Sequence, residues 1–377
     1  MRGKRRLSRI RKPVRRKGAE TNLLLTLLSF AFSVAATRLF LEITGFPQLG
    51  GGELHIAHVL WGGLFLFLAS LMPLILANRW VYPVSALVAG LGVGLFIDEV
   101  GKFITQTNDY FYPAAAPIVY AFFLLTVLLY LQVRKPFATD PRAELYRAFE
   151  ALQEVLDRDL EPTEHAELEI ALRRIQQTAK HPNIASLSNE LLEFLASDSL
   201  VTVPETPRAF ERFQSRLSEL ASRFLTEPRL RGLLVGGLAA LGIVALLGLA
   251  QLILAAPDSV GLDSMIQNLV SAGLVGNTGG FWWFVTSVGL ESLVGGVLLA
   301  ASGLLMAKRD VLGIRLAYFG LLASIAVVNL LVFYFEQFST IIPAAIQFAL
   351  LGALAYYRRH FMRSPALTQP TIAEGGA

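Results

Sequence analysis

Continuous apolar stretches separated by polar segments dominate the chain. They lie at roughly 22–44, 56–77, 81–105, 113–133, 231–254, 282–306, 311–334 and 340–357. About 20 apolar residues in a helix cross the ~30 Å hydrocarbon core of a bilayer. The stretches do not alternate in polarity, and an open β-sheet would leave its edge groups unsatisfied in lipid. The pattern therefore predicts an all-α, polytopic membrane helical bundle with about eight transmembrane helices.

The distribution of Lys and Arg predicts the orientation of these helices. Ten of the first 17 residues are Lys or Arg. If this tail is cytoplasmic, the outward loops are 45–55, 106–112, 255–281 and 335–339, and none of them contains Lys or Arg. Cytoplasmic loops are enriched in these residues. We therefore expect a multi-pass protein of a prokaryotic cytoplasmic (inner) membrane, with both termini cytoplasmic.

One long polar segment interrupts the apolar pattern and sets the expected organisation. It contains 17 acidic residues. The expected parts are a basic cytoplasmic tail at 1–21, a first membrane half of four helices at 22–135, a cytoplasmic helical domain at 136–230, a second membrane half of four helices at 231–358 and a cytoplasmic C-terminal tail at 359–377. The first apolar stretch is longer than the core of a signal peptide, so we expect it to remain as a helix.

Apolar residues at helical spacing predict three or four amphipathic helices in the polar segment. The expected apolar faces are Leu145, Phe149, Leu152 and Leu156; Leu168, Ala171, Leu172 and Ile175; and a coiled-coil-like seam at 210–224. These helices are expected to pack against the membrane domain or a second copy of the chain, which would make a homo-oligomer, or to bind a regulatory partner. A further amphipathic helix is expected at 262–273, on the outer surface.

Composition narrows the possible chemistry. The chain is 54% hydrophobic and 16% charged, and it has no cysteine, which excludes disulfides and thiolate chemistry. The net charge of +4 does not indicate nucleic-acid binding, because the excess lies in the basic tail directly before an apolar helix. Anionic lipid is the expected partner of that tail, besides the bilayer itself. Phosphate-loop, serine-hydrolase and zinc-hydrolase motifs are missing from the sequence.

Ionisable residues gather on the outer side of the first three apolar stretches. A charge inside a bilayer costs about 2.5–3.5 kcal/mol on insertion scales, so such residues pair, face a cavity or serve a function. In the third stretch, small residues precede Asp98 and Lys102 at four-residue spacing, which places both charges on a packing face, Asp98 about 10 Å from the outer end of the helix. The group consists of Arg38, Glu42, His55, His58, Asp98, Glu99 and Lys102.

Three interpretations of this group remain open. The first is a buried salt-bridge network, in which Lys102 reaches Asp98 or Glu99, and Arg38 reaches Glu42. The second is a proton- or ion-coupled transport pathway, because carboxylates and histidine exchange protons in a water-filled cavity. The third is a divalent-metal site, zinc or iron, because imidazole and carboxylate suit those ions. Its ligands would come from His55, His58, Asp98 and Glu99, with Glu53 as a further candidate.

Glu291 is the one acidic residue well inside an apolar stretch of the second half. It is expected to pair with Arg38 or Lys102, or to line the same cavity. The functional hypotheses are a transporter-like or channel-like protein for an ion or small solute, a membrane-embedded metal-dependent enzyme, and a membrane scaffold or signalling protein that acts through 136–230. No residue is singled out as catalytic.

Overall fold

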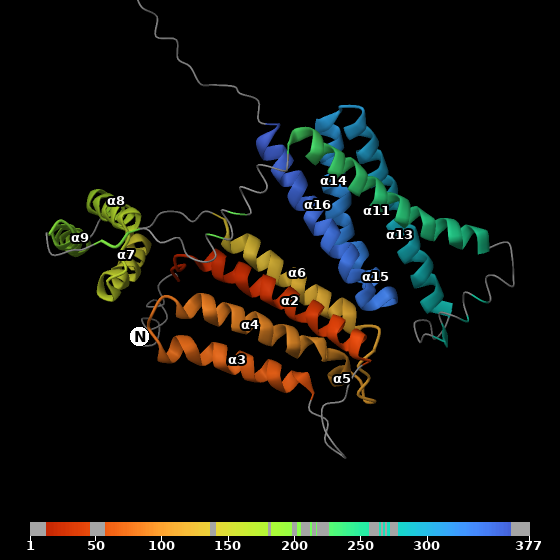
Figure 1. The fold of residues 1–377 in the computed structure, drawn as a ribbon, viewed down its shortest axis with the longest axis horizontal. Helices are drawn as coiled ribbons and strands as arrows, with labels where there is room; N and C mark the ends of the chain where they lie inside the picture. The colour runs from red at the N-terminus through yellow and green to blue at the C-terminus, as the bar shows by residue number, and fades with distance from the viewer. Residues whose placement is uncertain are drawn as a thin grey trace, which may run out of the picture. The chain divides into compact units, whose positions relative to one another are not determined.

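The computed structural model describes residues 13–45, 57–135, 141–179, 182–197, 202–204, 226–255 and 278–362, with a few isolated positions between 212 and 271. Within these ranges the regular elements are all helices. Two compact units are formed, one from residues 1–98 and 125–212 and the other from 99–124 and 213–377. The individual helices can be followed in Figure 1.

In the described part of the chain, seven helical segments are long and apolar enough to cross a membrane, which confirms the helical membrane bundle. Six of them correspond to single helices. These are α2 (Ala19–Thr44), α3 (His58–Ile75), α4 (Val81–Asp98), α6 (Ala115–Val133), α11 (Glu227–Ala255) and α13 (Thr278–Met306). The seventh segment covers Asp310–His360.

The seventh segment is 51 residues long and is not one straight helix. It consists of α14 (Asp310–Ala323), the π-helix η1 (Ser324–Val328), α15 (Asn329–Glu336), the 3-10 helix η2 (Gln337–Thr340) and α16 (Ile341–His360). At Gln337 the backbone takes φ 51° and ψ −133°, which an α-helix cannot accommodate. Figure 1 shows α16 running back alongside α14 and α15.

In the first unit, α4 packs closely against both α2 and α3. A Cβ atom on Gly94 would lie 2.6 Å from Oγ of Ser33 in α2, and one on Gly62 of α3 would lie 2.6 Å from the backbone nitrogen of Phe96 in α4. Small residues let helix backbones approach this closely. The small residues that recur every four positions in α4, which are Ala86, Gly90 and Gly94, therefore lie in its contact with α2.

The third apolar stretch does not form one continuous helix. α4 ends at Asp98, Glu99 takes φ −89° and ψ 10°, and a short helix, α5 (Val100–Ile104), follows. The break corrects two sequence predictions. Asp98 lies at the end of its helix and not about 10 Å inside it, and Lys102 does not continue the packing face of α4, because the helical register is interrupted between them.

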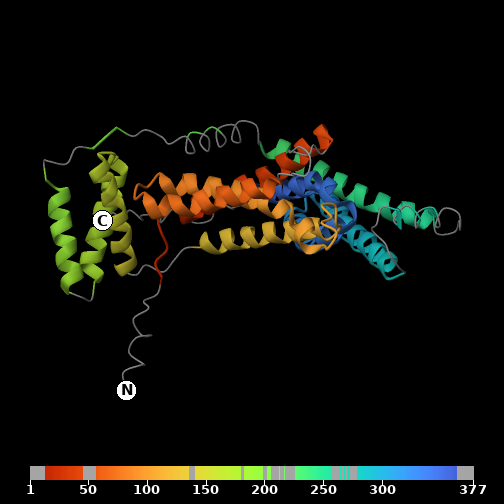
Figure 2. The ribbon, with the colours of Figure 1, turned by 90° about the horizontal axis from the view of Figure 1, so that it is seen from below.

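Three short helices form a separate cluster in the polar segment, and Figure 2 shows them side by side. They are α7 (Pro141–Asp157), α8 (Pro162–Thr178) and α9 (Pro182–Leu195). The shared apolar core includes Leu145, Leu168, Leu172, Ile175 and Leu195. The predicted face of α7 was partly wrong, because Ala148 and Ala151 are buried whereas Phe149 and Leu156 are exposed. The smaller alanines allow α7 to approach its neighbours.

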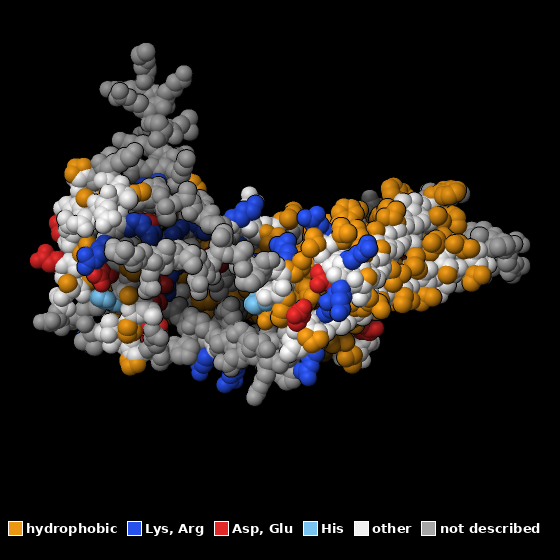
Figure 3. Space-filling view, turned by 90° about the horizontal axis from the view of Figure 1, so that it is seen from above, with side chains coloured by type: hydrophobic (Ala, Val, Ile, Leu, Met, Phe, Trp, Pro, Cys, Tyr) orange, Lys and Arg blue, Asp and Glu red, His pale blue; other side chains and the backbone are white. Residues whose placement is uncertain are grey.

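In the second unit, α11, α13, α14 and α16 share a core of leucines and other aliphatic residues. Their outer surfaces are apolar as well: Trp282, Trp283 and Leu254 are among many exposed large hydrophobic side chains. Figure 3 shows hydrophobic side chains spread over the surface of these helices. An apolar exterior of this extent fits contact with acyl chains and does not fit contact with water.

Some predicted features lie outside the described residues. These are residues 1–12 of the basic tail, residues 363–377, Glu53 and His55, nearly all of the seam at 210–224 and most of the outer amphipathic helix at 262–273. Within that last segment, the described positions Ser264, Gln267, Val270 and Ser271 are helical.

Candidate functional site

Three residues from three helices meet at one end of the first unit. Nε of Arg38 in α2 donates to Oδ1 of Asp98 at 2.6 Å, and Nη2 donates to the backbone carbonyl of Asp98 at 3.1 Å. On the other side, Nε2 of His58 lies 3.1 Å from Oδ2 of Asp98. Asp98 therefore bridges a guanidinium and an imidazole. We refer to Arg38, His58 and Asp98 as the polar triad.

The packing of α4 explains why these residues meet. On the α2 side, Gly90 contacts Ser29 and Gly94 contacts Ser33, so one more turn along both helices brings Asp98 to Arg38. On the α3 side the helices are antiparallel. Gly62 packs on Gly92 and Phe96, so one turn back along α3 brings His58 to Asp98. The triad is thus a geometric consequence of two glycine-mediated helix contacts.

Burial differs strongly across the polar triad. The side chain of Asp98 is inaccessible to solvent and that of Arg38 is 9% exposed, whereas that of His58 is 20% exposed. A carboxylate at the carboxyl end of a helix meets the negative end of the helix dipole, which is unfavourable. Arg38 offsets this cost, because it binds both the carboxylate and the last helical carbonyl. His58 is the triad member that reaches the surface.

The remaining members of the predicted group lie as follows. Nζ of Lys102 lies 3.4 Å from Oε2 of the buried Glu99 and 5.3 Å from the ring centroid of Tyr110. The ion pairs therefore join Lys102 to Glu99, one of its two expected partners, and Arg38 to Asp98. Glu42, the partner expected for Arg38, is exposed near the end of α2.

The metal interpretation depends on residues outside the described ranges. Among the described residues, no three His, Asp or Glu side chains are grouped so that they could hold a metal ion. His58 and Asp98 are in direct contact, but His55 and Glu53 would have to supply further ligands. Oδ1 of Asp98 is bound to Arg38 and Oδ2 lies against His58, so a metal ion would have to compete with both contacts.

A second polar cluster lies in the core of the second unit, and its tyrosine, Tyr120, was not predicted from the sequence. The hydroxyl of Tyr120 in α6 donates to the carbonyl of Ile325 at 2.7 Å. Nδ2 of Asn329 donates to the Tyr120 hydroxyl at 3.1 Å and to Oε1 of Gln347 at 2.9 Å. Ile325 lies in the π-helix η1, where the widened turn alters the usual pairing of backbone carbonyls. From the sequence alone, a buried tyrosine that forms hydrogen bonds cannot be distinguished from a tyrosine at the membrane interface, because both occur in apolar stretches.

Replacing Asn329 by alanine should destabilise the second unit. Asn329 is 2% exposed and is the donor to both Tyr120 and Gln347. Hydrogen bonds between membrane helices contribute about 0.6 kcal/mol on average and up to ~1.7 kcal/mol. We expect a loss of about 1–2 kcal/mol in detergent unfolding, since both interactions are removed. The control is Ser339→Ala, which removes only an exposed local hydrogen bond to Glu336; equal losses in both variants would contradict the assignment.

Glu291 lies in α13 and is partly buried. The carboxylate of Glu336, at the end of α15, acts on it electrostatically. Arg38 and Lys102, the partners expected for Glu291 from the sequence, form ion pairs with Asp98 and Glu99. A pairing of Glu291 with either basic residue stays a prediction.

No family model, curated protein or solved structure matches this chain.

Proposed function

We propose that this integral membrane protein crosses a cytoplasmic membrane eight times, with both termini and the α7–α9 cluster on the cytoplasmic side. The seventh apolar segment supports this count, since its 51 residues would extend about 77 Å as one helix, far beyond the hydrocarbon core. Two crossings separated by the break at Gln337 fit the bilayer. The loops without Lys or Arg support the orientation.

We further propose that the protein is transporter-like or channel-like and moves protons by way of the polar triad. The observation that carries this proposal is the contact between the solvent-inaccessible Asp98 and the partly exposed His58. Histidine is the side chain whose charge ordinarily changes between pH 5 and 8. Ionisable groups inside membrane bundles commonly form proton relays.

Each triad member has a distinct role in this proposal. His58 exchanges a proton with water, because it is the most exposed of the three. Asp98 accepts a hydrogen bond from neutral His58 and stabilises charged His58 through the same oxygen, so proton uptake does not break the contact. Arg38 is a positioning residue: its two hydrogen bonds hold the carboxylate toward His58. This arrangement gives a site that can change charge without moving its backbone.

Flux measurements test the proposal directly. The full chain is reconstituted into liposomes that contain a pH-sensitive dye, and the decay of an imposed pH gradient is recorded with valinomycin and potassium present. The wild type is expected to dissipate the gradient faster than protein-free liposomes. Asp98→Asn and His58→Ala should each slow the protein-dependent rate about tenfold or more, which corresponds to ~1.4 kcal/mol of barrier height.

Glu42→Gln is the matched control. It removes a carboxylate from the same end of α2 as Arg38, but from an exposed position. Its rate should equal that of the wild type. A wild-type rate no faster than protein-free liposomes, or unchanged rates in both triad variants, would refute proton movement through the triad. Helical content measured by circular dichroism checks that the variants fold.

A further inference from the structure

The short basic segment before α2 is firmly attached to the first unit. Nη1 of Arg15 donates to the carbonyls of Val133 and Lys135, the latter at 2.9 Å, where a guanidinium also meets the negative end of the α6 dipole. Nε of Arg16 lies 2.7 Å from Oε1 of Glu150 in α7, and the guanidinium carbon lies 3.5 Å from the ring centroid of Tyr82. Arg15 and Arg16 are therefore preorganised and do not belong to a free tail.

A cavity of about 390 Å³ lies between this segment and α7. The described residues that line it include four arginines and one carboxylate, which gives these residues a net formal charge of +3. The carboxylate is that of Glu150, which already pairs with Arg16 and accepts a hydrogen bond from the backbone nitrogen of Lys17 at 3.3 Å. The arginines are Arg15, Arg16, Arg142 and Arg147.

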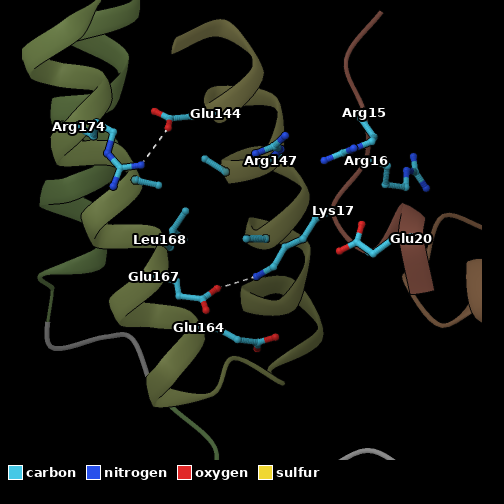
Figure 4. Close-up of a pocket in the computed structure, with 14 residues that line it drawn as sticks. Arg15, Arg16, Lys17, Glu20, Glu144, Arg147, Glu164, Glu167, Leu168 and Arg174 are labelled. Carbon is cyan, nitrogen blue, oxygen red and sulfur yellow. Dashed lines mark hydrogen bonds and ion pairs between the residues drawn. The ribbon is translucent and has the colours of Figure 1, made fainter. Parts of the chain in front are cut away.

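The neighbouring cavity shows that this excess of positive charge is confined to one cavity. It has a volume of about 310 Å³, and the described residues that line it include five basic and four acidic ones, which gives these residues a net formal charge of +1. Figure 4 shows its charged side chains and the pairs Lys17–Glu167, at 2.9 Å, and Arg174–Glu144, at 3.3 Å. Arg147 lines both cavities. The same surface therefore has one cavity with nearly balanced charges and one with a marked positive excess.

We propose that the 390 Å³ cavity is a binding site for a phosphate-bearing anion, either a soluble phosphate compound or the headgroup of an anionic lipid. Arginine forks match phosphate oxygens in bidentate geometry, and the volume lies within the range of small-ligand sites. Tyr146 and Phe149, which also line the cavity, are both exposed and offer an apolar face beside the charges. This site is separate from the polar triad and does not depend on proton movement.

Pyrophosphate binding to the full chain tests the site. The protein is placed in phosphatidylcholine nanodiscs and titrated with pyrophosphate by isothermal calorimetry. We expect saturable binding to the wild type and a dissociation constant at least about tenfold higher for Arg142→Gln/Arg147→Gln, because hydrogen bonds to charged groups are among the stronger polar contacts. Arg173→Gln is the matched control: Arg173 lies in α8, outside both linings, and pairs with Glu169. It should bind like the wild type.

Nanodiscs that contain phosphatidylglycerol distinguish the two sources of phosphate. Suppressed pyrophosphate binding in them would assign the site to lipid headgroups, and unchanged binding would assign it to a soluble compound. Absence of binding in phosphatidylcholine nanodiscs would overturn the proposal, as would equal losses in the double variant and Arg173→Gln. In the wild type, pyrophosphate should protect Arg147 but not the exposed Arg173 from phenylglyoxal, a test that does not depend on variant folding.

Discussion

Replacing Arg38 by methionine is expected to lower the free energy of unfolding by about 3–5 kcal/mol, the cost typical of breaking a buried ion pair from one side. The expected loss is large because Asp98 is fully buried and loses both the guanidinium on its carboxylate and the donor on its backbone carbonyl. Methionine keeps much of the apolar volume of the arginine stem, so the change in packing is small. Unfolding in mixed detergent micelles measures the effect.

The double variant Arg38→Met/Asp98→Asn is the decisive control. It removes the carboxylate charge together with its guanidinium partner, and replacing a whole buried pair is often close to neutral. We therefore expect the double variant to be more stable than Arg38→Met alone. A single variant that costs less than about 1 kcal/mol would show that the pair resembles an exposed surface pair, for which such small values are usual. The inferred burial of Asp98 would then be incorrect.

Replacing Gly62 by alanine is expected to separate α3 from α4. The added Cβ would lie 2.6 Å from the nitrogen of Phe96 and 2.9 Å from the carbonyl oxygen of Gly92. Both atoms are backbone, so no side chain can rotate away and the helices must shift. Overpacking of this kind costs about 1–3 kcal/mol. The same shift moves His58, one turn away on the same face of α3, from Asp98.

The adjacent Gly63 offers a matched control. A Cβ on Gly63 would have no neighbour within 4 Å, so Gly63→Ala introduces the same methyl group into the same helix without a clash. It should be neutral or stabilise by up to about 1 kcal/mol, since alanine is the better helix former. Detergent unfolding and the pH-gradient assay are measured for both variants. Equal stability and equal flux in the two would contradict the close α3–α4 contact.

Hydropathy predicted the boundaries of some helices but not of all. The predicted stretches at 22–44 and 113–133 correspond to α2 and α6 within a few residues, because desolvation in lipid acts on every residue of a span and leaves a long signal. The break at Glu99 was not predictable in the same way. Residues 97–104 contain no proline, and their charges are compatible with a continuous helix, so the local sequence did not reveal that α4 ends at Asp98.

The polar triad illustrates the same limit at the level of single contacts. The four-residue series in the third stretch indicated which face of α4 would pack, and Asp98 lies on that face. The partner of Arg38 was not predicted. Glu42 was expected because it follows Arg38 by four residues in the same helix, but the parallel packing of α2 and α4 brings Asp98 to Arg38. Tyr120 and Asn329 meet only because α6 and α15 pack together, 209 residues apart in sequence.

The sequence by itself determined that this chain is a helical membrane protein, which stretches are apolar enough to face lipid, and that a few costly charges had to lie in protein. Those properties follow from transfer free energies, which add up residue by residue along the chain. Only the tertiary structure decided which charges pair, where Asp98 lies in its helix, and that the arginines before α2 and those of α7 line the same cavity. Such contacts depend on the relative placement of helices to within an ångström, and that placement is set by many packing contacts at once.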